Sequence, residues 1–251
     1  MKMILRGEFE RNLLDNLKAL TLCVGWDVFG YEILEQVPNI EKLVVCDGSF
    51  KEMFCCESPN NVDYSGLLLQ LKELHLESLP ELVAWRLPFS NLTCLKVESC
   101  NRLPYLFTSS TVKSLTQLQR MEIKECESIE EIVSKEEGEE SDEDEIIFPQ
   151  LSYLNIENLE NLIRLYRGNL SLPLLEELSI TDCDQMVSLC AGTLDAGKLS
   201  QVTIDYEEGI PLETDLNSTL RMEFLKKVSV EFLLLNIYNT CFSTSYDGNC
   251  V

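Results

Sequence analysis

The sequence is poor in basic residues, and this shortage limits the kinds of partner that the protein can have. Over 251 residues, 20 Lys and Arg stand against 43 Asp and Glu, so the formal net charge at pH 7 is -23 with the one histidine neutral. DNA, RNA and anionic membrane surfaces are bound through clustered Lys and Arg. The balance therefore disfavours nucleic acid and favours a protein partner with a basic surface. Hydrophobic residues make up 45% of the chain, which predicts a packed core.

Long hydrophobic runs are also lacking, and with them the usual signals for a membrane. The apolar stretch near the C-terminus, 232–237, is far shorter than the roughly 18 residues needed to span a bilayer. The N-terminus returns to charge too soon for the apolar segment of a signal peptide. We therefore expect no direct membrane insertion and a cytoplasmic location. The 11 cysteines show no Cys-x-x-Cys pair and no histidine cluster, so we expect reduced thiols and no metal site.

Signatures of catalysis are equally scarce. The lone histidine, His75, lies between Leu74 and Leu76, and no Gly-x-Ser-x-Gly nucleophile motif accompanies it. The segment 192–198 (GTLDAGK) fits the start of a phosphate-binding loop, but Leu199 replaces the Ser or Thr that would hold magnesium. We therefore predict that the protein is not an enzyme and takes no cofactor.

What the sequence does have is a repeat. An apolar triplet with the spacing i, i+3, i+5 recurs nine times, and the first residues of successive triplets lie 21 to 33 residues apart. The triplets are Leu17/Leu20/Leu22, Ile40/Leu43/Val45, Leu71/Leu74/Leu76, Leu92/Leu95/Val97, Leu118/Met121/Ile123, Leu151/Leu154/Ile156, Leu175/Leu178/Ile180, Leu199/Val202/Ile204 and Leu225/Val228/Val230. Intervals of about 20 to 29 residues are typical of leucine-rich repeats.

The spacing of the triplet predicts the fold. The step from i+3 to i+5 is the alternation of a short strand whose two apolar side chains point into a core, and one coil cannot bury that face alone. We therefore predict an α/β leucine-rich-repeat solenoid, curved, with short parallel strands on its concave face and irregular or helical returns. The prediction is one domain, 1–251, of about nine repeats, with an irregular C-terminal end at 228–251. Cys100, Cys126 and Cys183 share one repeat position, which predicts a stack of small buried thiols.

An acidic tract occupies one of the two long intervals between triplets. Residues 127–145 hold 11 acidic residues and one base, so we expect a solvated loop insertion at 134–147. It is either a tolerated insertion or a docking site for a basic surface, and phosphorylation of Ser141 would strengthen its negative field. Its acidic residues are Glu136, Glu137, Glu139, Glu140, Asp142, Glu143, Asp144 and Glu145.

The side chains that alternate with the core residues of each strand point outward and form the candidate partner-binding surface. The outer face of the parallel strands is the usual ligand surface of such solenoids. The candidates are Glu73, His75, Glu77, Lys96, Glu98, Arg120, Glu122, Lys124, Tyr153, Asn155, Glu157, Glu177, Thr181, Asp205 and Tyr206. Most are charged or polar, and the two tyrosines are candidate anchors because aromatic residues are enriched among binding hot spots.

The repeats resemble those of a known family, the plant intracellular immune receptors with a nucleotide-binding domain and leucine-rich repeats, in particular the coiled-coil subclass of these disease resistance proteins. The likeness lies in the segments 43–54 (LVVCDGSFKEMF), 71–82 (LKELHLESLPEL), 105–110 (YLFTSS), 126–133 (CESIEEIV), the acidic tract, 148–151 (FPQL) and 215–219 (DLNST). It covers roughly residues 13 to 225.

The resemblance implies a role in the defence response. It implies that the repeats sense a pathogen effector or a guarded host protein, and that they restrain a nucleotide-binding switch domain. Neither a coiled coil nor a nucleotide-binding motif is found in this sequence, so the switch would be provided elsewhere, in cis or in trans. The alternative is a free-standing acidic leucine-rich-repeat adaptor that binds a basic protein partner.

Overall fold

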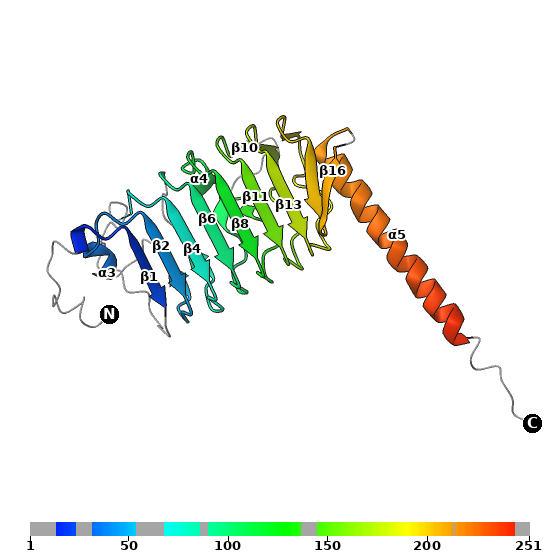
Figure 1. Ribbon diagram of the computed structural model, residues 1–251, viewed down its shortest axis with the longest axis horizontal. Coiled ribbons are helices and arrows are strands. Elements are labelled where there is room, and N and C mark those ends of the chain that lie inside the picture. Colours follow the sequence, from blue (N-terminus) through cyan, green and yellow to red (C-terminus); the bar gives the residue numbers. More distant parts are fainter. Residues whose placement is uncertain are drawn as a thin grey trace, which may run out of the picture.

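The protein is built around one long sheet of short strands (Figure 1). The computed structural model describes residues 14–23, 32–53, 68–85, 90–136, 145–212 and 214–243, with side chains up to residue 230. Within this part of the chain the sheet has nine strands in the order β1-β2-β4-β6-β8-β11-β13-β15-β16. The strands are β1 (Ala19–Cys23), β2 (Lys42–Cys46), β4 (Glu73–Glu77), β6 (Cys94–Glu98), β8 (Arg120–Lys124), β11 (Tyr153–Glu157), β13 (Glu177–Thr181), β15 (Gln201–Ile204) and β16 (Glu207–Pro211).

The first eight strands of this sheet are the strands predicted from the first eight triplets. They pair in parallel and in register, so that Leu74 lies between Leu43 and Leu95, and Leu154 lies between Met121 and Leu178. The two later residues of each triplet alternate along a strand, as predicted from the spacing i+3 to i+5. The chain is therefore a solenoid of parallel strands, and each coil places one strand in the sheet.

The core lies directly behind this sheet. Leu43, Leu74, Leu95, Met121 and Leu154 are all fully buried. Burying one such side chain contributes roughly 1.5 to 3 kcal/mol, so stacking supplies most of the stability of each coil. The predicted buried thiols are also present: Cys100 and Cys126 are fully buried and in contact, with the Cys100 N–H donating to the Cys126 sulfur at 3.4 Å, and Cys183 is 7% exposed.

A column of left-handed residues follows the strands and turns the chain back toward the core. Asp47, Ser78, Ser99, Glu125, Asn158 and Asp182 all have φ between 51° and 55°. In the first five, the backbone N–H donates to the carbonyl of the residue that ends the neighbouring strand, for example from Ser99 to Lys124 at 3.0 Å. These bonds hold the turns in a regular stack, because each coil fixes the turn of its neighbour.

The returns on the opposite side of the core are made mostly of short strands. They are β3 (Glu52–Met53) with β5 (Ala84–Trp85), β7 (Phe107–Thr108) with β9 (Val133–Ser134), and β10 (Glu145–Ile147), β12 (Asn169–Ser171) and β14 (Leu194–Asp195) in a three-stranded sheet. Two single-turn helices, α3 (Glu32–Glu35) and α4 (Ser109–Val112), complete the described returns. Aromatic rings line this side, with Phe107 between Trp85 and Phe148 at centroid distances of 5.7 and 6.5 Å.

The ends of the acidic tract correct the predicted loop. Ser134 belongs to β9, and Glu145 to Ile147 form β10, so the predicted bounds 134–147 include residues of two strands. Ile146 enters the core, being 2% exposed, and this burial explains why the chain becomes extended before the acidic run has ended. Residues 137–144 lie outside the described residues.

The C-terminal end departs from the repeat. After β15 the chain turns through Asp205 and Tyr206, with φ of 46° and 70°, into the antiparallel strand β16. It then forms one long helix, α5 (Leu216–Ser243), which projects away from the sheet (Figure 1). The predicted ninth strand at Leu225/Val228/Val230 is therefore wrong, and so is the irregular end predicted for 228–251 as far as Ser243.

Local chemistry explains the helix. Asp215 caps its first turn, because its carboxylate accepts the backbone N–H of Ser218 at 2.9 Å. Leu216 and Leu220 pack against the last coil, at 3% and 4% exposed. The spacing i, i+3 that we read as a strand triplet also places residues on one face of a helix.

Candidate interaction surface

The outward side chains of the sheet form three rows that run across the strands. The register aligns Glu73, Cys94, Arg120, Tyr153 and Glu177 in a first row. A second row holds His75, Lys96, Glu122, Asn155 and Ser179, and a third holds Glu77, Glu98, Lys124, Glu157 and Thr181. The structure thus brings the sequence-predicted strand residues together on one face.

Thr181 is a correction to that prediction. It occupies the third row as expected, but it is 4% exposed and so presents almost no surface to a partner. It lies next to Asp182, toward which Tyr206 reaches back from the turn after β15. The period-2 pattern gives the direction of a side chain from its strand, but it does not show what covers it.

Charges on the face are largely paired between neighbouring strands. Lys42 contacts Glu73 at 2.8 Å, and Lys124 contacts Glu157 at 2.5 Å. The Glu122 carboxylate forms ion pairs with Lys96 at 2.9 Å and with Arg120 at 2.6 Å. Just before β1, β2 and β4 begin, the Glu41 carboxylate forms ion pairs with Lys18 at 2.7 Å and with Lys72 at 2.8 Å. The middle of the face is therefore close to neutral, although each exposed pair contributes only about 0 to 1 kcal/mol.

These pairs shift the acid strength of the groups that form them. The hydrogen bonds from Lys18 and Lys72 lower the pKa of Glu41 to about 2, and the hydrogen bond from Lys42 lowers the pKa of Glu73. Partial burial opposes ionisation of Glu122, but the hydrogen bonds from Lys96 and Arg120 outweigh it, so the pKa of Glu122 is also lowered. All three carboxylates are thus held ionised by neighbouring cations, from adjacent coils and, for Glu122, also from Arg120 of its own strand.

His75 and Tyr153 are the polar and aromatic centres of this face. Burial, followed by Lys42 and Lys96, lowers the pKa of His75, so the imidazole is neutral at pH 7. Its Nε2 lies 3.8 Å from a Glu73 oxygen. The guanidinium carbon of Arg120 lies 3.6 Å from the centroid of the Tyr153 ring, a cation–π contact that occupies one face of the predicted anchor.

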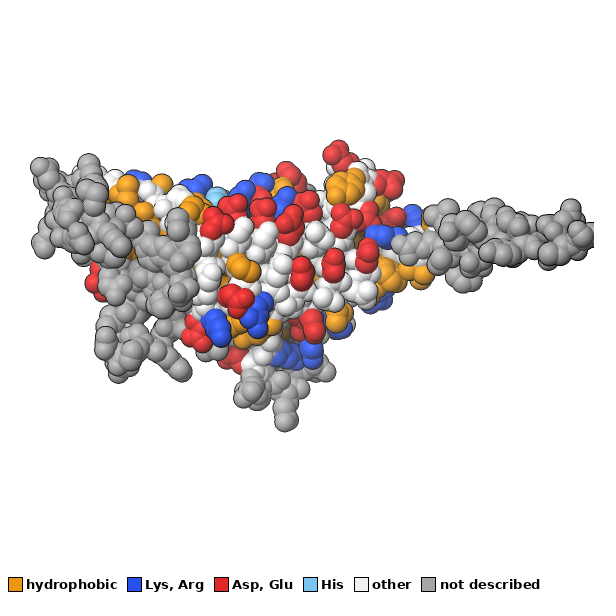
Figure 2. Space-filling view, turned by 90° about the horizontal axis from the view of Figure 1, so that it is seen from below, with side chains coloured by type: hydrophobic (Ala, Val, Ile, Leu, Met, Phe, Trp, Pro, Cys, Tyr) orange, Lys and Arg blue, Asp and Glu red, His pale blue; other side chains and the backbone are white. Residues whose placement is uncertain are grey.

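A second acidic surface follows the strands at their carboxyl ends, and it was not among the surfaces predicted from the sequence. We call it the carboxyl edge; it consists of Ser99, Asn101, Glu125, Glu127, Asn158, Glu160, Asp182 and Asp184. Figure 2 views the molecule from this side and shows acidic side chains gathered along it. Its signal in the sequence is the acidic residues on either side of a buried one, as in Glu125-Cys126-Glu127 and Asp182-Cys183-Asp184.

The carboxyl edge contains a shallow groove of about 140 Å³ between the turns that follow β6, β8 and β11. Glu125 accepts a hydrogen bond from the Ser99 hydroxyl at 2.9 Å, and Glu127 accepts one from the Asn101 amide at 3.0 Å. Among the described residues, no Lys or Arg forms an ion pair with Glu125, Glu127 or Glu160. Unlike the sheet face, the part of this edge that holds Glu125, Glu127 and Glu160 carries uncompensated negative charge, whereas Asp184 at its C-terminal end pairs with Lys227.

At the C-terminal end, α5 forms an ion pair with one predicted site residue, Asp205, and so makes it less available to a partner. Lys227 contacts Asp205 at 3.0 Å and Asp184 at 2.5 Å. Burial opposes the charge on Lys227, but the hydrogen bonds to Asp184 and Asp205 raise its pKa. Tyr206 is 72% exposed, and its hydroxyl donates to Asp182 at 2.9 Å. This predicted anchor therefore remains accessible, whereas Asp205 is held by the helix.

The acidic tract is described only at its two ends. Glu136 accepts a hydrogen bond from the Ser110 hydroxyl, and Glu145 is exposed at the start of β10. The other six candidates, Glu137, Glu139, Glu140, Asp142, Glu143 and Asp144, lie outside the described residues, as does Ser141. The choice between a tolerated insertion and a docking site therefore stays open.

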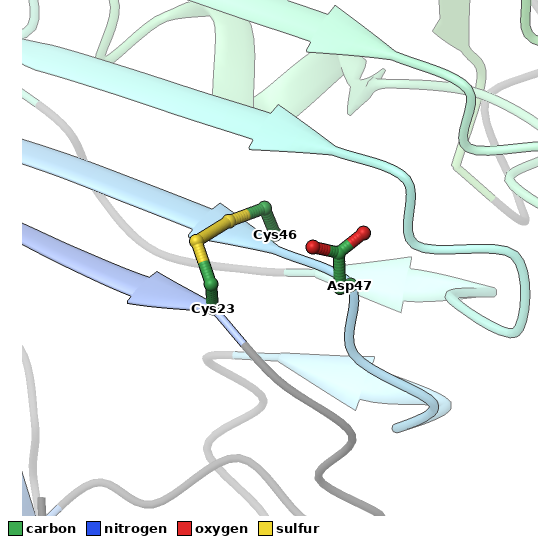
Figure 3. Close-up of side chains that lie close together, drawn as sticks. All are labelled: Cys23, Cys46 and Asp47. Carbon is green, nitrogen blue, oxygen red and sulfur yellow. A yellow bond between two sulfur atoms is a disulfide. The ribbon is translucent and has the colours of Figure 1, made fainter.

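One disulfide corrects the expectation of reduced thiols. Cys23 and Cys46 are register partners at the ends of β1 and β2, and they form a disulfide with Cα atoms 4.6 Å apart (Figure 3). The sequence hid this pair because a separation of 23 residues is one repeat interval, so the two positions stack only in the folded solenoid. Cys94, Cys100, Cys126, Cys183 and Cys190 are free.

The match to a family model agrees with the repeat architecture. The family described as "Plant disease resistance protein RPS2-like, leucine-rich repeats" matches residues 1–127 and 83–205. A protein of Arabidopsis thaliana, "Probable disease resistance protein At5g63020", is 26% identical over 195 residues, which are 72% of this chain and 21% of that protein. Among solved structures, the leucine-rich repeat domain of the type III effector XCV3220 (XopL) matches 77% of this chain and 70% of its own, with a TM-score of 0.42 and 15% identity.

The described part of the chain holds no helix that is both long and apolar enough to cross a membrane.

Proposed function

Because the chain belongs to the leucine-rich-repeat family of plant disease resistance proteins, we propose that it is a protein-recognition module of the defence response that senses a pathogen effector or a guarded host protein. In the same proposal it restrains a nucleotide-binding switch domain until that ligand binds. The region shared with the Arabidopsis relative is 21% of that protein, and in this proposal the switch is a domain outside that region. We also propose that the module acts in the cytoplasm.

The observation that carries this proposal is the division of charge between the two surfaces. On the sheet face, Glu73, Glu122 and Glu157 each contact a cation of the same face. On the carboxyl edge, Glu125 and Glu127 are bonded only to neutral donors. A basic partner gains more from carboxylates whose charge is uncompensated, because it need not displace an existing ion pair. The carboxyl edge is therefore the proposed docking surface for the switch domain.

The sheet face suits a different kind of ligand. Its rows present neutral pairs, a neutral imidazole and the Arg120–Tyr153 stack, a mixture that favours specific contacts over attraction at long range. Recognition of the effector or guarded protein is therefore proposed for this face, with Tyr206 as an exposed aromatic anchor beside it. Two separate surfaces allow one partner to be held while another binds.

The test of the proposal is a binding assay between the chain and a purified nucleotide-binding domain of a coiled-coil resistance protein. We expect binding that weakens steeply from low to high salt, because exposed charges are screened beyond about 8 Å at physiological ionic strength. Neutralising Glu125, Glu127 and Glu160 together to Gln should abolish it. Affinity that is unchanged by salt would contradict electrostatic docking.

A matched control separates the carboxyl edge from net charge. Glu35, Glu52 and Asp195 are exposed on the returns α3, β3 and β14, and neutralising them to Gln, Gln and Asn changes the charge by the same amount. This control variant should bind nearly as well as the parent chain. Equal losses in both variants would mean that only total charge matters, and would move the docking site off the carboxyl edge.

The second candidate function is a free-standing acidic adaptor for a basic protein. It is favoured by the same uncompensated carboxyl edge, which needs no switch in the same polypeptide. An immunoblot of the source tissue with an antibody to this chain distinguishes the two functions. A band near 28.7 kDa favours the adaptor, and a much larger band favours the recognition part of a receptor.

A further inference from the structure

Three metal-ligating side chains meet where β1 and β2 end (Figure 3). Cys23 and Cys46 face each other across the two parallel strands, and Asp47 follows Cys46 directly. The two sulfur atoms and a carboxylate oxygen of Asp47 all lie within 4.8 Å of one another. Asp47 lies on the same side of the sheet as the carboxyl edge and lines one pocket with Ser99 and Asn101, but nothing in the proposed function uses the cluster.

The fold itself positions these three groups. Register places the two cysteines side by side at the last position of their strands. Asp47 has φ of 55°, and its N–H donates to the Glu77 carbonyl at 3.2 Å, so the turn holds its carboxylate next to Cys46. No described Lys or Arg forms an ion pair with Asp47, in contrast to Glu41 and Glu73 nearby. The carboxylate is therefore available to a cation.

The first two coils differ from the later ones at this position. In the same row the next register partners are Glu77 with Glu98 and Lys124 with Glu157, none of which is a thiol. The two cysteines thus offer soft ligands on adjacent strands with a hard ligand beside them. Two cysteines and a carboxylate form a donor set that Zn²⁺ accepts in proteins.

We propose that the reduced form of the Cys23–Cys46–Asp47 cluster binds a thiophilic divalent cation, Zn²⁺, and that disulfide formation closes this site. Two thiolates on one tetrahedral zinc lie roughly 3.8 Å apart, given Zn–S bonds of about 2.3 Å. Neighbouring strands are about 4.8 Å apart, so the two side chains reach this separation by rotamer changes without moving the backbone. Water fills the fourth position, as in other zinc sites with three protein ligands.

The chemistry of opening and loading is balanced. A dithiol reductant transfers two electrons and two protons to the Cys23–Cys46 bond and becomes a cyclic disulfide. The products in the protein are two thiols. Zn²⁺ then displaces both thiol protons into solvent and accepts one electron pair from each thiolate and one from the Asp47 carboxylate. The site therefore exists only in the reduced protein, and oxidation removes both sulfur ligands at once.

The experiment is a cobalt titration of the full chain in its reduced and disulfide forms. The chain is reduced with dithiothreitol, freed of reductant under nitrogen and titrated with Co²⁺, whose thiolate charge-transfer absorption reports sulfur ligands. We expect a band that saturates near one equivalent in the reduced chain and is displaced by Zn²⁺. The disulfide form should not give this band, and its appearance there would overturn the proposal.

Variants assign the signal to these residues among the 11 cysteines of the chain. Cys23→Ala and Cys46→Ala should each lose the band. Asp47→Asn keeps both thiols and the turn, and should weaken cobalt binding roughly tenfold or more, as loss of a metal-site partner does. Cys94→Ala is the matched control, because it removes a free thiol of the same sheet. A band that survives in both cysteine variants, or an unchanged affinity in Asp47→Asn, would refute the proposed site.

Discussion

From β4 to β13 every strand of the sheet has a parallel neighbour on both sides, whereas β15 has a parallel neighbour on one side only. The same type of apolar triplet behaves differently in the two regions. Leu74, Leu95 and Leu154 are fully buried, but Leu225 and Val230 are 56% and 55% exposed on α5. The comparison teaches that the triplet forms a strand only where coils stack on it, since one coil cannot bury its own apolar face.

The largest difference should appear when one leucine is shortened in each region. Leu154→Ala removes a fully buried side chain between two coils and should lower the free energy of unfolding by about 2 to 5 kcal/mol. Leu225→Ala removes an exposed side chain from α5 and should change it by no more than about 0.5 kcal/mol. Urea unfolding followed by circular dichroism measures both. Similar losses would show that Leu225 packs as a core residue, and the comparison would fail.

A smaller effect tests whether α5 depends on its own local signals. Asp215→Ala removes the carboxylate that accepts the Ser218 N–H and should cost about 0.5 to 2 kcal/mol of helix stability. The loss should appear in the far-ultraviolet helix signal while the sheet signal remains. Asp195→Ala serves as the control, because Asp195 lies in β14 and caps no helix. If Asp215→Ala unfolded the sheet together with the helix, the two regions would form a single cooperative unit.

The regular part of the fold could be predicted because its signal is repeated. Leu71/Leu74/Leu76 fixes a strand, and the residues between them, Glu73 and His75, follow on the outer face. Eight consistent copies reinforce one another, and this is why the strands and the buried cysteine stack agree with the expectation. The ninth copy lies in α5, beyond the antiparallel strand β16, and its i, i+3 spacing fits a helix equally well.

What the sequence did not reveal depends on neighbours that are distant along the chain. The Cys23–Cys46 contact requires knowing that the first two coils stack in register. The pairing of Glu122 with Lys96 depends on side-chain geometry across strands, and its pairing with Arg120 on geometry along its own strand. The neutrality of the sheet face is therefore invisible in a count of charges. The acidic carboxyl edge could have been predicted from the sequence, because its acidic residues recur at fixed repeat positions.

The C-terminal end should lose stability at alkaline pH through Lys227. Its pKa is raised above the usual 10.5 in the folded state, so the stabilisation is fully present below about pH 10.5 and is lost as the pH rises further. Lys227→Met should therefore lower the helix signal at neutral pH by a small amount, and the difference from the parent chain should shrink above that pH. Lys226→Met is the control, because Lys226 contacts Glu223 of its own helix at 2.5 Å. A difference that does not change with pH would contradict the ion pair.

The middle of the sheet should show the opposite dependence, with the smallest amplitude. The hydrogen bond from Lys42 lowers the pKa of Glu73 below its usual 4.5, so its contribution is present above that pH and is lost as the pH falls through the lowered value. Glu73→Gln should thus reduce stability slightly near pH 7 and match the parent chain in strong acid. Both groups are partly exposed, so screening keeps the effect within about 1 kcal/mol. Glu77→Gln on the same strand, where no described cation pairs with the carboxylate, is the control that should stay level across the same range. The measurement is the thermal unfolding midpoint of each chain between neutral pH and strong acid. If the ion pair stabilises the sheet, the midpoint of Glu73→Gln approaches that of the parent chain as the pH falls, and the difference for Glu77→Gln does not change.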